Sequence, residues 1–150
     1  MAIRFRPHWL VRIDEARVLE AIAEAEYRTS GEIRVSISRF FWGPVRPTAE
    51  RAFHRLKMDA TKDRNGILFY IVPSRRKFVI LGDEGIHARV GPDFWTETAS
   101  ALSRRFRNGE FTDGLIEGIR TAGERLAAHF PHDRATDRNE LPDEIDYGRR

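Results

Sequence analysis

Four side chains that offer oxygen ligands stand beside predicted turns and could together hold a metal ion. Glu32 follows the turn formers Thr29-Ser30-Gly31, Asn65 precedes an apolar run, and Asp83 and Glu84 lie between two glycines after a second apolar run. If the second run is antiparallel to the first run and to the strand that begins near Glu32, its end lies near the starts of both, and these side chains meet. Carboxylate and amide oxygens are the ligands that Ca²⁺ and Mg²⁺ prefer. The sequence therefore predicts a Ca²⁺ or Mg²⁺ site formed by Glu32, Asn65, Asp83 and Glu84.

A simpler interpretation of the same residues stays open. Gly82-Asp83-Glu84-Gly85 is also an ordinary turn sequence. Acidic residues are common at helix starts because they interact favourably with the helix dipole.

Arg75 and Arg76 form a second candidate site at a predicted hairpin turn. Their forked guanidinium donors could receive an anionic group. Ligands of open α/β sheets usually bind outside the carboxyl ends of parallel strands, where Ser36, Ser38 and Ser74 would also lie. The alternative is that arginines in a hairpin turn simply face solvent.

The composition limits the classes of function. The chain has 150 residues and no cysteine, so it suits one domain and excludes disulfides, thiolate metal sites and cysteine nucleophiles. No Gly-x-Ser-x-Gly, phosphate-cradling glycine loop or His-Glu-x-x-His appears. No run of about 18 apolar residues could span a bilayer, and the first residues do not resemble a signal peptide. We therefore expect a cytoplasmic protein with no transmembrane segment.

The charges are unevenly distributed. Lysine and arginine number 26 against 23 acidic residues, and six of the acidic residues lie after residue 130. The basic body could attract phosphates or anionic surfaces. Its arginines are scattered among acids, however, and no RNA- or DNA-binding motif is visible, so we expect no nucleic-acid partner.

The spacing of apolar residues predicts the elements that position these side chains. Asp14 is predicted to cap a first helix, and Thr48 to cap a second helix that runs to Met58. A strand beginning near residue 33 precedes the second helix, and the run 66–72 is typical of a strand covered on both faces. A tight turn then leads into a strand over 77–81, which makes an antiparallel hairpin. Two further helices are predicted from Asp93 to Asn108 and from Phe111 to Phe130.

The order of these elements predicts the fold. The unit from residue 33 to 72 is expected to be a right-handed parallel crossover, with helices on both sheet faces. We therefore predict an α/β fold: a three-layer α/β/α sandwich with a mixed, mostly parallel sheet and a β-hairpin. Residues 1–130 form the predicted domain, and 131–150 an acidic tail that lies on the surface or stays mobile. The residues that could dock this tail are Leu141, Pro142, Ile145 and Tyr147.

Five motifs in order give the chain a family resemblance that covers roughly residues 10 to 146. They are Ala25-Glu26-Tyr27-Arg28-Thr29-Ser30-Gly31-Glu32-Ile33-Arg34-Val35-Ser36, Thr61-Lys62-Asp63-Arg64-Asn65-Gly66-Ile67-Leu68, Gly82-Asp83-Glu84-Gly85-Ile86-His87, Phe106-Arg107-Asn108-Gly109-Glu110-Phe111 and Asn139-Glu140-Leu141-Pro142-Asp143-Glu144-Ile145. The chain resembles the short bacterial branch of the TPM domain family, which includes thylakoid-lumen phosphatase-like proteins. The resemblance implies the same three-layer sandwich, divalent-cation binding as in some TPM domains, and a phosphatase role found in some relatives only.

Two functional hypotheses follow. The first is a module without established catalysis that binds a divalent cation and docks a protein partner, which could be membrane-associated. Its docking element would be the acidic tail or the aromatic run Phe40-Phe41-Trp42, for which core packing is the simpler and favoured explanation. The second is a metal-assisted acid phosphatase acting on phosphomonoesters, in which the ion polarises a phosphoryl oxygen and activates water. Long TPM domains that resemble the phosphatase members carry an additional acidic segment upstream of the first strand. This chain has no counterpart of that segment beyond Asp14 and Glu15, so we favour the module.

Overall fold

A three-stranded mixed sheet forms the middle layer of this computed structural model, which describes residues 13–38, 43–91, 93–132 and 144–148. The strands are β1 (Glu32–Ile37), β2 (Gly66–Val72) and β3 (Lys77–Gly82), in the spatial order β1-β2-β3. β1 pairs parallel with β2, in the register Glu32 opposite Gly66, and β2 pairs antiparallel with β3. The predicted parallel crossover and the predicted hairpin are thus both present.

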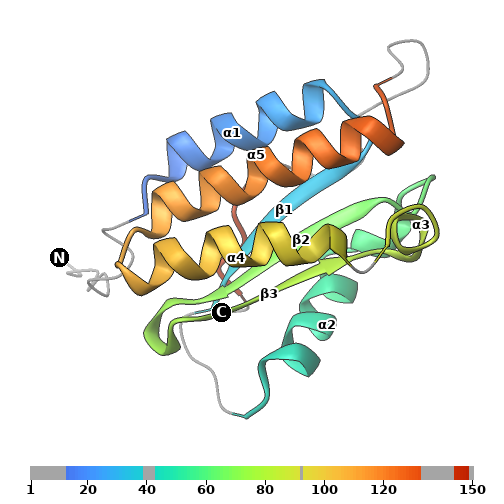
Figure 1. The fold of residues 1–150 in the computed structure, drawn as a ribbon. Helices are drawn as coiled ribbons and strands as arrows, with labels where there is room; N and C mark the ends of the chain where they lie inside the picture. The colour runs from blue at the N-terminus through green and yellow to red at the C-terminus, as the bar shows by residue number, and fades with distance from the viewer. Residues whose placement is uncertain (1–12, 39–42, 92, 133–143, 149–150) are drawn as a thin grey trace, which may run out of the picture.

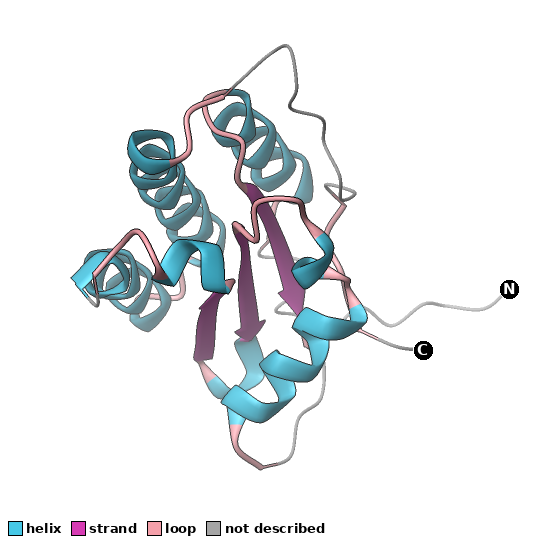
Figure 2. Cartoon of the chain, turned by 90° about the vertical axis from the view of Figure 1, so that its right-hand side faces the viewer, coloured by secondary structure: helices cyan, strands magenta, loops and turns pink. Residues whose placement is uncertain are grey.

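Helices cover both faces of this sheet. The helices α1 (Glu15–Tyr27), α4 (Asp93–Arg107) and α5 (Phe111–His129) lie on one face, and α2 (Val45–Arg55) lies on the other (Figures 1 and 2). Every residue of β2 is buried, because apolar side chains pack against it from both sides. The three-layer α/β/α sandwich predicted from the sequence is confirmed.

The helix signals in the sequence locate three of these helices closely. Asp14 caps α1 as predicted, its carboxylate accepting a hydrogen bond from the Arg17 backbone N–H at 3.2 Å. α4 begins at Asp93 and ends before Gly109, whose φ of 76° is the left-handed conformation that stops a helix. The stripe of α5 is buried through Leu115, Ile119 and Leu126, because it faces the sheet.

The prediction for the second helix is wrong at both ends. α2 begins at Val45 rather than after Thr48, whose hydroxyl instead donates to the carbonyl of Pro44 at 3.4 Å. Pro47 is tolerated inside this helix because it lies in the first turn, where backbone N–H groups have no intrahelical acceptor. The helix ends at Arg55 rather than Met58, because Lys57 adopts the left-handed conformation with φ 59° and Met58–Ala60 form a separate 3₁₀ turn.

Two features near the ends of the sheet were not predicted as helix or strand. A one-turn helix, α3 (Glu84–His87), follows β3 directly and is capped by Asp83. Residues 144–148 lie beside β1, where Ser36 and Asp146 form an isolated parallel bridge (Figure 1, dark red). Ile145 is buried and Tyr147 packs against the core, so both residues dock the tail as the sequence allowed. Leu141 and Pro142 lie outside the described residues, and the domain boundary at residue 130 stays a prediction.

Candidate functional site

The end of the sheet where β1 and β2 begin and β3 ends carries the predicted metal ligands. Glu32 is the first residue of β1 and pairs with Gly66, the residue after Asn65. Ile67 pairs with Gly82, and the backbone N–H of Asp83 donates to the Gly66 carbonyl at 3.0 Å. Strand register therefore delivers Glu32, Asn65 and Asp83 to the same end of neighbouring strands, and Glu84 follows at the start of α3.

Asp83 is held in this position by a bidentate ion pair. Its side chain is 6% exposed and accepts hydrogen bonds from Arg64 Nε at 2.7 Å and from Arg64 Nη2 at 2.9 Å. The same carboxylate accepts the backbone N–H of Glu84 at 2.8 Å, which caps α3. The hydrogen bond to Asp83 raises the pKa of Arg64 above its ordinary value. Asp83 thus already has a cationic partner in the fold.

Arg64 also contacts Glu84, so one guanidinium lies between two carboxylates. Its Nη1 is 3.1 Å from Glu84 Oε1, and the Glu84 side chain is 73% exposed. Arg64 has φ 51°, a left-handed backbone conformation that is uncommon for residues with a side chain. Gly85 donates its N–H to the Arg64 carbonyl at 2.9 Å, which fixes this loop against α3.

Only glycine fits at position 85. A Cβ there would lie 2.2 Å from the Asp63 carbonyl oxygen and 2.6 Å from the Arg64 carbonyl oxygen, both of them backbone atoms. The second glycine of the Gly-Asp-Glu-Gly motif therefore serves close packing of two backbones. This close contact places the start of α3 over the loop that carries Arg64.

Glu32 and Asn65 complete the predicted ligand set from buried positions. Their exposed fractions are 3% and 1%. The Asn65 side-chain amide donates to Ser30 Oγ at 3.1 Å, and its backbone carbonyl accepts the Glu32 N–H at 3.4 Å. Glu26 turns back to the strand, where its Oε2 accepts the Ile33 N–H at 2.9 Å. Among the described residues, His, Cys, Asp and Glu side chains form no group of three or more arranged to hold a metal ion. The metal site stays a prediction.

A polar groove of about 260 Å³ adjoins Asp83 and was not predicted. One wall is a face of α2, and the other walls are the Asp59 turn, the end of β3 and α3. The Asp59 carboxylate lies 3.0 Å from His54 Nδ1, and this hydrogen bond lowers the pKa of Asp59. The polar and charged side chains that line the groove are Arg46, Glu50, His54, Asp59, Arg64, Asp83 and His87. Positions 46, 50 and 54 are four apart, so their helical spacing was a readable signal.

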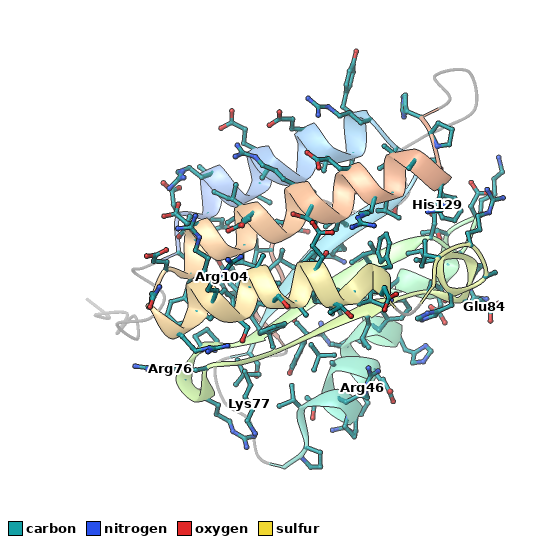
Figure 3. All side chains as sticks on the ribbon, in the orientation of Figure 1. Arg46, Arg76, Lys77, Glu84, Arg104 and His129 are labelled. Carbon is teal, nitrogen blue, oxygen red and sulfur yellow. The ribbon has the colours of Figure 1, made fainter. Side chains whose placement is uncertain are left out.

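The predicted anion site lies at the opposite end of the sheet. Figure 3 shows Arg76 and Glu84 far apart, at the two ends of the hairpin formed by β2 and β3. Arg75 donates through Nη1 to the Gly43 carbonyl at 2.9 Å, so it ties the hairpin turn to the start of α2. Arg76 is exposed and left-handed, with φ 52°. Anion binding by Arg75 and Arg76 stays a prediction, and the aromatic run Phe40-Phe41-Trp42 lies outside the described residues.

A second polar cluster, formed by Ser36, Arg55 and Asp146, lies beside β1 and was not predicted from the sequence. Asp146 accepts hydrogen bonds from both terminal nitrogens of Arg55, at 3.0 and 2.7 Å, and from Ser36 Oγ at 2.8 Å. The side chains of Arg55 and Asp146 are 24% and 11% exposed. Burial alone would raise the pKa of Asp146, but the hydrogen bonds from Arg55 and Ser36 outweigh it and hold this pKa below its ordinary value.

The fold and these polar clusters define a class: a single-sheet α/β/α domain with charged groups at one end of the sheet and beside the edge of β1. Its family follows from the sequence, because the TPM domain model matches residues 7–125. The chain belongs to the TPM domain family. The BA42 protein from the psychrophilic bacterium Bizionia argentinensis is a similar solved structure, with 43% identity, a TM-score of 0.85, and coverage of 89% of this chain and 92% of that chain.

A more distant solved structure shares the fold alone. The N-terminal domain of the cg2496 protein from Corynebacterium glutamicum has a TM-score of 0.59 at 10% identity, and covers 100% of this chain and 96% of that chain. No curated protein matches the chain. Among the described residues no helix is long and apolar enough to cross a membrane.

Proposed function

We propose that this TPM-domain protein is a module that binds Ca²⁺ or Mg²⁺ and docks a protein partner, without established catalysis. The observation that supports the cation site is the delivery of Glu32, Asn65 and Asp83 to one end of the sheet, with Glu84 exposed beside them. Carboxylates and an amide carbonyl are a hard-oxygen donor set that suits both ions. The residues that would hold the cation are Glu32, Asn65, Asp83 and Glu84.

Arg64 would compete with a bound cation for the carboxylates of Asp83 and Glu84. Its guanidinium now neutralises Asp83 and Glu84 at 2.7 and 3.1 Å. A divalent ion that used these carboxylates would compete with Arg64 for them, and the arginine would then turn toward solvent, where 41% of its side chain already lies. This competition predicts weak binding in the wild-type chain and tighter binding when the arginine charge is removed.

Titration with CaCl₂ and MgCl₂, followed by backbone amide NMR shifts, tests the cation site. Clustered shifts at Glu32, Asn65, Asp83 and Glu84 support it. Glu84→Gln should weaken the binding, and Arg64→Gln should tighten it. Glu20→Gln on the exposed surface of α1 is the matched control and should change nothing. If neither cation moves these amides at millimolar concentration, or if Glu84→Gln binds like wild type, the cation site is wrong.

The groove beside Asp83 is the observation that favours the phosphatase alternative. Arg46, Arg64 and His87 line its volume of about 260 Å³ together with three carboxylates, so a small phosphomonoester that enters with a divalent cation is the fitting substrate class. Turnover of a generic phosphomonoester in the presence of Mg²⁺, lost in Asp83→Asn and reduced in Arg46→Gln, would support it. Folding of both variants is checked by circular dichroism. Cation binding without any turnover supports the module instead.

A further inference from the structure

Residues 144–148 occupy the outer edge of β1 as a short added strand. The backbone N–H of Asp146 donates to the Val35 carbonyl at 2.9 Å, and the N–H of Ile37 donates to the Asp146 carbonyl at 2.8 Å. These two bonds bracket Ser36, as in a parallel ladder. Arg34 adds a hydrogen bond from Nη2 to the Glu144 carbonyl at 3.3 Å. The segment thus uses the hydrogen-bonding groups that an edge strand offers to another chain.

The side chains of this segment alternate as those of a strand do. Ile145, which is 6% exposed, and Tyr147 pack with the core cluster under α1 and α5. Asp146, between them, bonds to Arg55 of α2 on the other side of the sheet. The edge of β1 therefore receives an apolar–Asp–apolar triplet. An apolar surface contacts its first and third residues, and Arg55 and Ser36 form a polar socket for its second residue.

The socket recognises a carboxylate specifically. Arg55 presents a guanidinium fork to both oxygens of Asp146, and Ser36 donates to Oδ2. The Gly148 backbone N–H reaches the same oxygen at 3.2 Å. Bidentate guanidinium–carboxylate pairs combine strength with geometric selectivity, and both side chains are mostly withdrawn from solvent. An amide in place of the carboxylate would leave one of the two Arg55 nitrogens without an acceptor, and an apolar side chain would leave both without one.

We propose that the β1 edge is a docking groove for an extended segment of a protein partner that carries an apolar–Asp–apolar triplet, and that residues 145–147 occupy this groove in cis. This inference deepens the partner-docking part of the proposed function and rests on it. Addition of a strand to an exposed sheet edge is a recurring mode of peptide recognition, in which ladder bonds give affinity and alternate side chains give specificity. The tail then acts as a built-in competitor of the partner.

The groove and its occupant come from two parts of the chain that are far apart in sequence, as the 91 positions between Arg55 and Asp146 show. Ser36, Val35, Ile37 and Arg55 all lie within residues 7–125, the region that matches the TPM family model. The occupant at 144–148 lies outside that region, near the end of the chain. The receiving surface and the segment that fills it are therefore separate in sequence, and a contact between separate segments can be replaced by the same contact with another chain.

A labelled peptide with the sequence of residues 143–149 tests the groove in trans by fluorescence polarisation. The acceptor is the full-length chain carrying Asp146→Ala, which frees the socket, and the reference is the wild-type chain, whose own tail competes. We expect the peptide to bind the variant at least tenfold more tightly, because occupancy in cis reduces the fraction of open groove. The milder variant Asp146→Asn and circular dichroism spectra guard against a folding defect.

The controls separate recognition from nonspecific binding. Arg55→Gln in the Asp146→Ala chain should abolish peptide binding, whereas Arg51→Gln, one turn earlier and exposed on α2, should not. A peptide with asparagine in place of Asp146 should bind at least tenfold more weakly. Equal binding of both peptides, or binding that ignores Arg55, would overturn the inference.

Two further outcomes decide against it. If the peptide binds neither chain while both are folded, the tail contact serves stability only. If the wild-type chain forms concentration-dependent dimers by light scattering that Asp146→Ala removes, the natural occupant is the tail of a second copy rather than a partner protein. Neither Glu84 nor a cation enters this assay, so its failure leaves the proposed cation site standing, and the reverse also holds.

Discussion

Replacing Asp146 by asparagine tests the contribution of the Arg55–Asp146 ion pair to stability. The change keeps the shape of the side chain but removes its charge and one of its two acceptor oxygens, so the Arg55 fork loses a partner. Hydrogen bonds to charged groups contribute about 1.5–3 kcal/mol each, and the pair is only partly shielded, with exposed fractions of 24% and 11%. We expect a loss of about 2 kcal/mol in the free energy of unfolding. For a domain of this size that lowers Tm by about 4–8 °C.

The same pair predicts how this loss depends on pH. The pKa of Asp146 is lowered in the folded state, so the carboxylate stabilises the fold above its unfolded pKa of about 3.9. As the pH falls through the lower, folded pKa, the carboxylate becomes protonated and this stabilisation disappears. The difference between wild type and Asp146→Asn should therefore be complete near pH 7 and shrink below about pH 4.

Urea denaturation at pH 7 and at pH 3, together with amide hydrogen exchange at Ile37, measures both effects. Asp113→Asn is the matched control, because Asp113 pairs with Arg17 at 3.2 Å while both side chains are more than half exposed. That pair should contribute about 1 kcal/mol or less. Equal losses in Asp146→Asn and Asp113→Asn, with unchanged exchange at Ile37, would refute the reasoning.

Two further predictions concern the groove beside Asp83 and the loop that packs against it. Gly85→Ala should lower the free energy of unfolding by more than about 1 kcal/mol in urea titrations, because its Cβ would lie 2.2 Å from the Asp63 carbonyl oxygen. The control Gly91→Ala, whose Cβ would have no neighbour within 4 Å, should lower the free energy of unfolding less. The pKa of Asp59, followed by NMR, should lie below its ordinary value in wild type and rise toward it in His54→Gln, because the His54 hydrogen bond is the main cause of the shift; an unchanged Asp59 titration would contradict the contact.

The elements that local pattern determines were predictable from the sequence. The run 66–72 became β2 with the predicted bounds, and the stripe from Phe111 became α5, because burial on one or both faces leaves a direct periodic signal. α3 was missed because four residues carry no period, and its formation depends on the Asp83 cap and on packing at Gly85. The early start of α2 was missed because Pro47 resembles a break unless the first turn is already known.

The candidate sites also contain some contacts that the sequence predicts and others that it does not. Strand order alone brings Glu32, Asn65 and Asp83 to one end of the sheet, so their shared end could be inferred from the predicted parallel crossover and hairpin. The ion pair of Arg64 could not, because it depends on the left-handed backbone at that residue. Arg55 and Asp146 are 91 positions apart in the sequence, and no local pattern predicts a contact between residues so far apart.

The polar row on β1 explains why only a particular segment can cover this edge. Glu32, Arg34 and Ser36 alternate with the buried Ile33, Val35 and Ile37, yet their exposed fractions are 3%, 5% and 1% on a strand with no other strand outside it in the described sheet. Buried polar groups are costly unless they are hydrogen-bonded. An occupant that offered only backbone bonds would satisfy the ladder but leave Arg55 and the Ser36 hydroxyl without the carboxylate. The discrimination therefore comes from the cost of burying these donors next to the wrong side chain, which is why any partner that displaces the tail must bring an acidic residue to the position of Asp146.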